Sequence, residues 1–178
     1  MPEIVKILER IIPYIAIGLI IIPIIVILII LRFRDKKIMN LYMEGKYDEA
    51  NQKLNSLKNF AFGAYKQWHY YYEALILIAK ENYLLADKIL KNIKYKKMEK
   101  SKLFWQCFIQ INLGNVDLVN YYYKLFDKLS QKEELDNKIL SSLIEHMHDN
   151  THKMKNTIYK EVKNPVLIKY IKNMNVLN

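Results

Sequence analysis

The side chains best suited to chemistry are a group of histidines near residue 150 and a single cysteine. His148 and His152 would share a face of a continuous helix, but His146 points away from that face, and Asp149 is the carboxylate next to His148. No HExxH pattern is present, and a zinc site needs several convergent ligands. Cys107 lies in the apolar stretch FWQCFIQI, where a thiol usually packs as a small core residue. We therefore expect no metal site and no reactive thiol.

Other catalytic signatures are absent from the sequence. The chain has only 4 glycines among its 178 residues, and none of them forms a phosphate-binding loop. No nucleophile elbow and no carboxylate pair in an apolar context can be identified. We expect a protein that is not an enzyme and that needs no cofactor.

The positive charge of the chain comes mainly from lysine. The net charge is +10, and Arg10, Arg32 and Arg34 are the only arginines. Because nucleic-acid sites rely on the planar arginine side chain, a lysine excess fits anionic lipid better than nucleic acid, although a compositional bias explains it equally well. A cluster of lysines around one predicted junction is expected to be a solvated loop, with lipid or nucleic acid as the alternative partner: Lys91, Lys94, Lys96, Lys97, Lys100 and Lys102.

Residues 11–31, IIPYIAIGLIIIPIIVILIIL, contain no charged side chain. If this stretch spans a membrane, it anchors the rest of the chain there. A helix of this length rises about 31 Å, close to the hydrocarbon thickness of a bilayer. The stretch is longer than the apolar part of a signal peptide and is followed by no small-residue cleavage site. We therefore predict an uncleaved transmembrane helix over 11–31, preceded by a short N-terminal lead over 1–10.

Basic residues flank this stretch unequally. The N-terminal flank offers Lys6 and Arg10, and the C-terminal flank carries a basic set of Arg32, Arg34, Lys36 and Lys37. Because basic flanks stay on the cytoplasmic side, we expect the N-terminus outside and the C-terminal part in the cytoplasm.

A short pattern recurs three times after the anchor. Gly45, Glu81 and Gly114 are each followed by an aromatic or β-branched residue two positions on and a small or β-branched residue five positions on. The intervals of 36 and 33 residues are typical of helical-hairpin repeats. The first helices of the three units are expected at Arg32–Glu44, near 64–80 and near 98–113.

These residues resemble the tetratricopeptide repeat (TPR) family in a degenerate form. The matching positions are Gly45, Tyr47, Ala50, Tyr83, Ala86 and Gly114, with Ala74 and Cys107 at the small position of two first helices. The resemblance implies an all-α fold with three helix pairs over 32–130. Residues 131–178 would then form a capping helix, expected at 132–149, and a basic tail that breaks at Asn164–Pro165 into two short helices.

The resemblance also implies a partner-binding groove lined by the first helices. Its expected residues are Trp68, Tyr71, Leu75, Ile78, Phe104, Phe108 and Ile111. Such a groove would hold an apolar helix or an extended peptide. The alternative is that the C-terminal helix fills the groove and these residues form core.

We therefore predict a single-pass, membrane-anchored TPR-like scaffold whose cytoplasmic domain binds other proteins. The alternative function is a basic membrane-surface module that binds anionic lipid or, with less support, nucleic acid.

Overall fold

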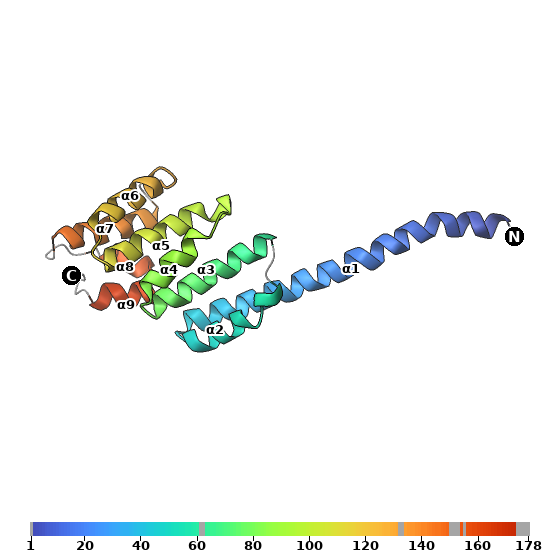
Figure 1. Cartoon of the computed structure of the whole chain (residues 1–178), viewed down its shortest axis with the longest axis horizontal. Coiled ribbons are helices and arrows are strands. Elements are labelled where there is room, and N and C mark those ends of the chain that lie inside the picture. Colours follow the sequence, from blue (N-terminus) through green and yellow to red (C-terminus); the bar gives the residue numbers. More distant parts are fainter. Residues whose placement is uncertain (1, 61–62, 132–133, 150–153, 155, 174–178) are drawn as a thin grey trace. The chain divides into compact units, whose positions relative to one another are not determined.

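A computed structural model describes residues 2–60, 63–131, 134–149, 154 and 156–173 of the chain. The described residues form helices and connecting segments and contain no strand. The helices are α1 Pro2–Met43, α2 Tyr47–Asn55, α3 Gly63–Ala79, α4 Tyr83–Lys91, α5 Glu99–Asn112, α6 Val116–Asp127, α7 Leu135–His148, α8 Asn156–Glu161 and α9 Pro165–Asn173, with short 3-10 turns at Lys58–Phe60 (η1) and Lys96–Met98 (η2) (Figure 1). The all-α prediction is confirmed.

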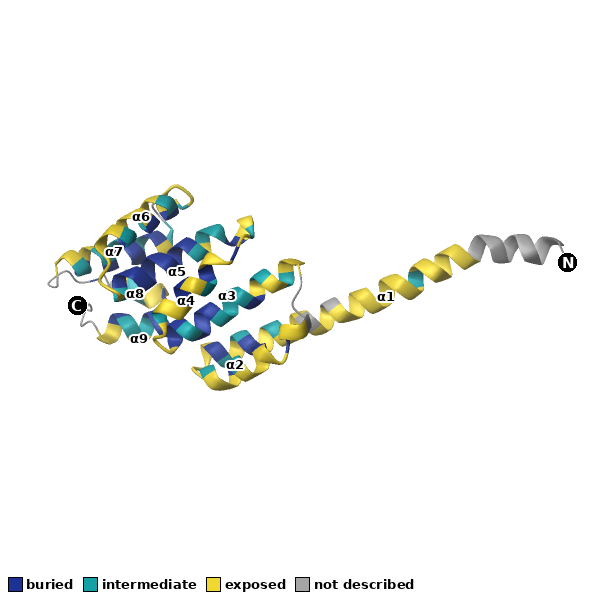
Figure 2. Cartoon of the chain, viewed as in Figure 1, coloured by how far each residue is buried: buried dark blue, intermediate teal, exposed yellow. Residues whose placement is uncertain are grey.

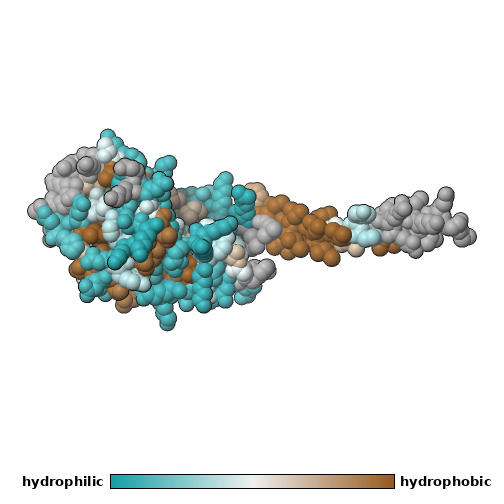
Figure 3. Space-filling view, turned by 90° about the horizontal axis from the view of Figure 1, so that it is seen from above, coloured by the Kyte–Doolittle hydropathy of each residue, from teal (hydrophilic) through white to brown (hydrophobic). Residues whose placement is uncertain are grey.

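The chain divides into two units, Met1–Asn40 and Leu41–Asn178. In the first unit, the isoleucines from Ile12 to Ile30 have exposed side chains, for example Ile20 at 64% and Ile22 at 63% (Figure 2). This segment appears as the hydrophobic band along α1 in Figure 3. Within Ile12–Met43, α1 is long and apolar enough to cross a membrane. The basic side chains Arg32, Arg34, Lys36 and Lys37 are exposed.

The second unit contains antiparallel helix pairs, α3–α4 and α5–α6 among them, and its turns share one repeated design. At each turn a residue adopts positive φ: Gly45 at 77°, Glu81 at 61° and Gly114 at 68°. In each turn the amide after this residue bonds a carbonyl five positions back, as Lys46 N–H does to Leu41 O at 2.9 Å. These bonds make a Schellman motif, which ends a helix because a left-handed residue cannot continue it. The predicted helix ends are confirmed to within one or two residues.

Small side chains let the paired helices approach closely. Ala50, Ala86 and Val119 each lie one turn into the second helix of a pair, and none of them has exposed surface. Ala74 on α3 and Cys107 on α5 are also fully buried.

Helix α5 forms the centre of the second unit. Its residues Leu103–Ile111 are all buried, because α4, α6 and α7 each pack against it. Figure 2 shows the buried faces gathered around α5. This segment of α5 is buried on every side, including the polar side chains of Gln106 and Gln110, so it lies in the interior of the domain.

Candidate interaction surfaces

The structure buries most of the predicted groove. Leu75, Ile78, Phe104, Phe108 and Ile111 are all 5% exposed or less. These five residues therefore do not form an open groove in this arrangement, because other helices of the domain cover them. The accessible members of the set are Trp68, which is 41% exposed, and Tyr71, which is partly buried.

Helix α9 covers Phe108. The Tyr170 ring lies edge-on to the Phe108 ring with 4.9 Å between centroids, and Trp105 contacts the same ring at 5.5 Å. Val166, Leu167 and Ile171 of α9 are also buried. The small cavity that remains, about 40 Å³, is lined in part by Ile78, Phe108 and Tyr170. At this position the structure corresponds to the alternative of a groove filled by the C-terminal helix.

The residues Asn164 and Pro165 set the start of α9, as the sequence predicts. The Asn164 Oδ1 atom accepts hydrogen bonds from the amides of Val166 at 3.0 Å and Leu167 at 3.4 Å, which caps the helix. It also accepts a hydrogen bond from the Tyr42 hydroxyl at 3.3 Å. Burial raises the pKa of Tyr42 well above its usual range. This bond links the C-terminal segment to the first helix pair of the domain.

An aromatic cluster of Trp68, Tyr71 and Tyr72 lies on the N-terminal half of α3. Trp68 lies three and four positions before Tyr71 and Tyr72, which places it near both rings, with 6.1 Å between centroids in each case. The adjacent Tyr71 and Tyr72 rings have centroids 6.2 Å apart. The Trp105 indole N–H donates to the Tyr71 hydroxyl at 3.1 Å, which joins the cluster to α5. Burial raises the pKa of Tyr71. The cluster thus has a fixed inner side, and Trp68 faces solvent.

Two polar contacts hold α3 in place beneath this cluster. The buried His69 ring pairs its Nε2 with the Leu54 carbonyl on α2 at 3.2 Å. The Gln67 Oε1 atom accepts a hydrogen bond from the Lys94 amide at 2.7 Å. Because the side chains of Gln67 and His69 are both hydrogen-bonded, the backbone that carries Trp68 is held in place.

A second hollow lies between α7 and the α8–α9 segment. Its volume is about 630 Å³, and its walls combine apolar and charged side chains: Leu135, Asp136, Ile139, Lys160, Glu161, Val162, Lys163, Asn164 and Leu167. Burial raises the pKa of Asp136. The volume lies in the range of small-molecule sites. The charges of both signs along its walls do not converge on one binding chemistry.

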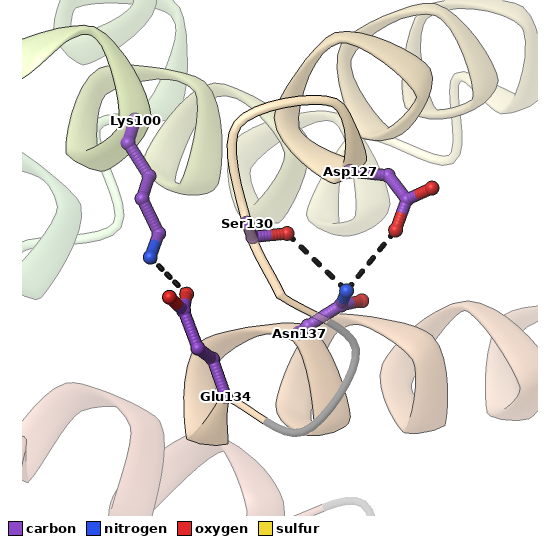
Figure 4. A network of polar contacts seen from close by, with 5 residues as sticks. All are labelled: Lys100, Asp127, Ser130, Glu134 and Asn137. Carbon is purple, nitrogen blue, oxygen red and sulfur yellow. Dashed lines mark hydrogen bonds and ion pairs between the residues drawn. The ribbon is translucent and has the colours of Figure 1, made fainter.

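The corner between α6 and α7 is held by a polar network (Figure 4). The Asn137 side-chain amide donates to Asp127 Oδ1 at 3.1 Å and to Ser130 Oγ at 3.2 Å, and its carbonyl accepts from the Tyr123 hydroxyl. Lys100 on α5 forms an ion pair with Glu134 just before α7. Sequence reasoning did not identify this network, because Asn137 is buried only in the folded domain.

The structure shows where the cysteine and the histidines considered for chemistry lie. Cys107 is fully buried, and its Sγ lies 3.8 Å from the Val119 carbonyl oxygen. Burial raises the pKa of this thiol to about 12, which disfavours the reactive thiolate. His146 is buried, His148 is exposed, and His152 lies outside the described residues. Across the described residues no three His, Cys, Asp or Glu side chains are grouped as a metal site.

One buried acid was also missed by sequence reasoning. Asp87 on α4 is 8% exposed, and its Oδ2 atom accepts from Lys91 Nζ at 2.5 Å. Its Oδ1 atom is buried and has no hydrogen-bond partner among the described residues. The spacing of four residues on one helix is the sequence signal that could have identified this pair.

Comparisons of the chain with known protein families, with curated proteins and with solved structures found no match.

Proposed function

We propose that this chain is a single-pass, membrane-anchored scaffold with a TPR-like domain that binds protein partners on the cytoplasmic face. The observation that carries the proposal is the aromatic cluster of Trp68, Tyr71 and Tyr72 on the domain, in which Trp68 is exposed and the two tyrosines are partly buried. Aromatic side chains that are rigid on one side and exposed on the other are enriched among the residues that dominate protein interfaces.

Two features support the other parts of the proposal. The repeated Schellman turns, 36 and 33 residues apart, favour the TPR-like interpretation of the three helix pairs. The apolar stretch of α1, with its basic C-terminal flank, favours a membrane anchor with the domain in the cytoplasm. The proposal assigns a binding role and no catalytic residue.

Site-specific photo-crosslinking tests this function in membranes of the source cell. A photoreactive phenylalanine analogue replaces Trp68 in the full chain, and a matched control carries it at Tyr121, which is 58% exposed on α6. We expect a discrete crosslinked protein from position 68 and none from position 121. Its loss on Tyr72→Ala, with helical content unchanged by circular dichroism, would assign the contact to the cluster.

A contrary result is equally clear. If position 68 gives no discrete product, or gives the same products as position 121, the aromatic cluster is not a protein-binding surface and the proposed function fails.

A further inference from the structure

The helix pairs give the domain two chemically different ends. Because consecutive helices are antiparallel, the Schellman turns at Gly45, Glu81 and Gly114 lie at one end, which we call the turn end. The α2–α3, α4–α5 and α6–α7 connections lie at the other, which we call the loop end (Figure 1). Contacts across neighbouring pairs agree with this division: Lys80 pairs with Asp48 at the turn end, and Lys100 pairs with Glu134 at the loop end.

The turn end is acidic, and three of its lysines form ion pairs. Its acids are Glu44, Asp48, Glu49, Glu81 and Asp117. Lys46 pairs with Glu44 at 2.8 Å, Lys80 pairs with Asp48, and Lys169 pairs with Glu81 at 2.9 Å. In these ion pairs, nearby carboxylates offset the positive charge of the three lysines.

The loop end is basic. Its acids include Glu99 and Glu134, which are paired with Lys102 and Lys100, and Asp127 and Asp136 at the α6–α7 corner. A further set of exposed lysines there makes no ion pair with any described carboxylate; we call these the loop-end lysines, and they are Lys58, Lys66, Lys94, Lys96 and Lys97. Lysines without a described carboxylate partner are therefore concentrated at the loop end.

The loop between α4 and α5 carries three of these lysines, and its backbone is anchored to the core. Ile93 and Met98 are 1% and 2% exposed, so the loop is pinned into the core on both sides of Lys94–Lys97. The Lys94 amide is bonded to Gln67, and Lys102 Nζ reaches the Ile93 carbonyl at 3.4 Å. Because the backbone is held, the ammonium groups project from a fixed surface.

We propose that the loop end docks on the anionic lipid headgroups of the membrane that carries the chain. Charge complementarity supports this partner, because a lysine near an anionic bilayer surface strengthens binding by about fivefold. A tethered domain also meets its own membrane at high effective concentration, so weak contacts suffice. The inference rests on the membrane anchorage in the proposed function and adds an orientation, with the acidic turn end directed away from the bilayer.

Helix α4 offers a matched pair of reporter positions. Asn82 precedes the helix at the turn end and Asn92 follows it at the loop end, and both side chains are exposed. Asn82→Cys and Asn92→Cys would each accept a fluorophore, while the buried Cys107 stays unlabelled. The full chain is reconstituted into nanodiscs of phosphatidylcholine alone or mixed with phosphatidylserine. Quenching by a headgroup-labelled lipid reports proximity to the bilayer.

We expect the label at position 92 to be quenched more strongly in the phosphatidylserine discs, and this excess to vanish at high salt, because salt screens exposed charges. The label at position 82 should show no excess. Lys94→Glu with Lys97→Glu should abolish the excess at position 92. The charge-matched variant Lys160→Glu with Lys163→Glu, on the C-terminal segment, should retain it.

Several outcomes would overturn the inference. Equal quenching at positions 82 and 92, or no difference between the two lipid mixtures, would contradict docking of the loop end. Loss of the excess in the Lys160 and Lys163 variant alone would assign the contact to the C-terminal segment. Tighter binding of an RNA homopolymer, lost with Lys94→Glu and Lys97→Glu, would assign the lysines to nucleic acid. Failure of the chain to enter discs of either composition would contradict the anchor itself, and so the proposed function.

Discussion

At the scale of single residues, the three turns of the domain use different residues for one backbone conformation. Gly45 and Gly114 adopt positive φ without a side chain, whereas Glu81 holds φ at 61° with one. A left-handed conformation costs a non-glycine residue about 1–2 kcal/mol. The second turn therefore carries a strain that the first and third avoid.

This difference predicts that two substitutions will change the free energy of unfolding in opposite directions. Glu81→Gly should raise the free energy of unfolding by about 1 kcal/mol, and Gly114→Ala should lower it by about 1 kcal/mol. An added Cβ at Gly114 meets no atom within 4 Å, so only the backbone conformation should matter. Urea unfolding of the full chain in detergent, followed by circular dichroism, measures both.

Lys169→Ala is the control for the first variant, because it removes the exposed Lys169–Glu81 ion pair without changing the turn. Such an exposed pair contributes little to stability, because water and salt screen the charges. A destabilised Glu81→Gly protein would contradict the strain at this turn.

Buried phenols predict how stability depends on alkaline pH. Burial raises the pKa of Tyr170 from 10.0 to about 12. In the unfolded chain this phenol loses its proton first, so the unfolded state binds fewer protons and stability falls as pH rises from about 10 toward 12. We expect Tyr170→Phe to match the parent chain at pH 7 and to lose less stability at pH 11.

The measurement is urea unfolding at both pH values, with phenolate absorbance recorded in parallel. Tyr121→Phe serves as the control, since Tyr121 is 58% exposed. An equal loss of stability in the Tyr170→Phe and Tyr121→Phe proteins would show that Tyr170 does not contribute to the alkaline loss.

At the scale of elements, α9 joins the domain through its contact with α5. Phe108 is fully buried, and its ring contacts Tyr170. Phe108→Ala should lower the free energy of unfolding by about 3–5 kcal/mol, because truncating a buried aromatic ring leaves a cavity. The double variant with Tyr170→Ala should cost about 0.5–1.5 kcal/mol less than the sum of the single changes, which is the range of an aromatic pair.

A double-mutant cycle by urea unfolding measures this coupling. Trp68→Ala paired with Tyr170→Ala supplies a control cycle, because no ring contact joins these residues in the described structure. Additive effects of Phe108→Ala and Tyr170→Ala would mean that α9 does not cover α5 in solution.

At the scale of the whole molecule, the proposed anchor and orientation lead to a prediction for intact cells. Residues 11–31 should hold the chain in membranes through alkaline carbonate washing, because this treatment removes peripheral proteins but not spanning helices. In sealed cells, added protease should leave the C-terminal domain intact, and after permeabilisation it should digest that domain.

Ile24→Lys tests the anchor directly, since a charge at the centre of a spanning helix costs about 2.5–3.5 kcal/mol in insertion. Phe33→Lys, just beyond the apolar stretch, is the matched control and should insert normally. Digestion of the domain in sealed cells would reverse the orientation, and release by carbonate would contradict the anchor.

The sequence by itself determined the features that depend on local chemistry. The length and composition of residues 11–31 predicted an apolar helix, and the recurring pattern that begins at Gly45, Glu81 and Gly114 predicted where helices end. Asn164 and Pro165 predicted the start of α9, because one residue caps and the other preorganises a first turn. Each of these signals acts within a few residues along the chain.

Only the tertiary structure decided which surfaces remain accessible. The sequence placed Phe104 and Phe108 on an apolar helix face, but it did not decide whether that face lines an open groove or is covered, and here α9 covers Phe108. The separation of engaged and unpaired lysines between the two ends likewise depends on pairs such as Lys80 with Asp48, which are 32 residues apart. Such contacts join segments distant in sequence, so no local pattern contains them.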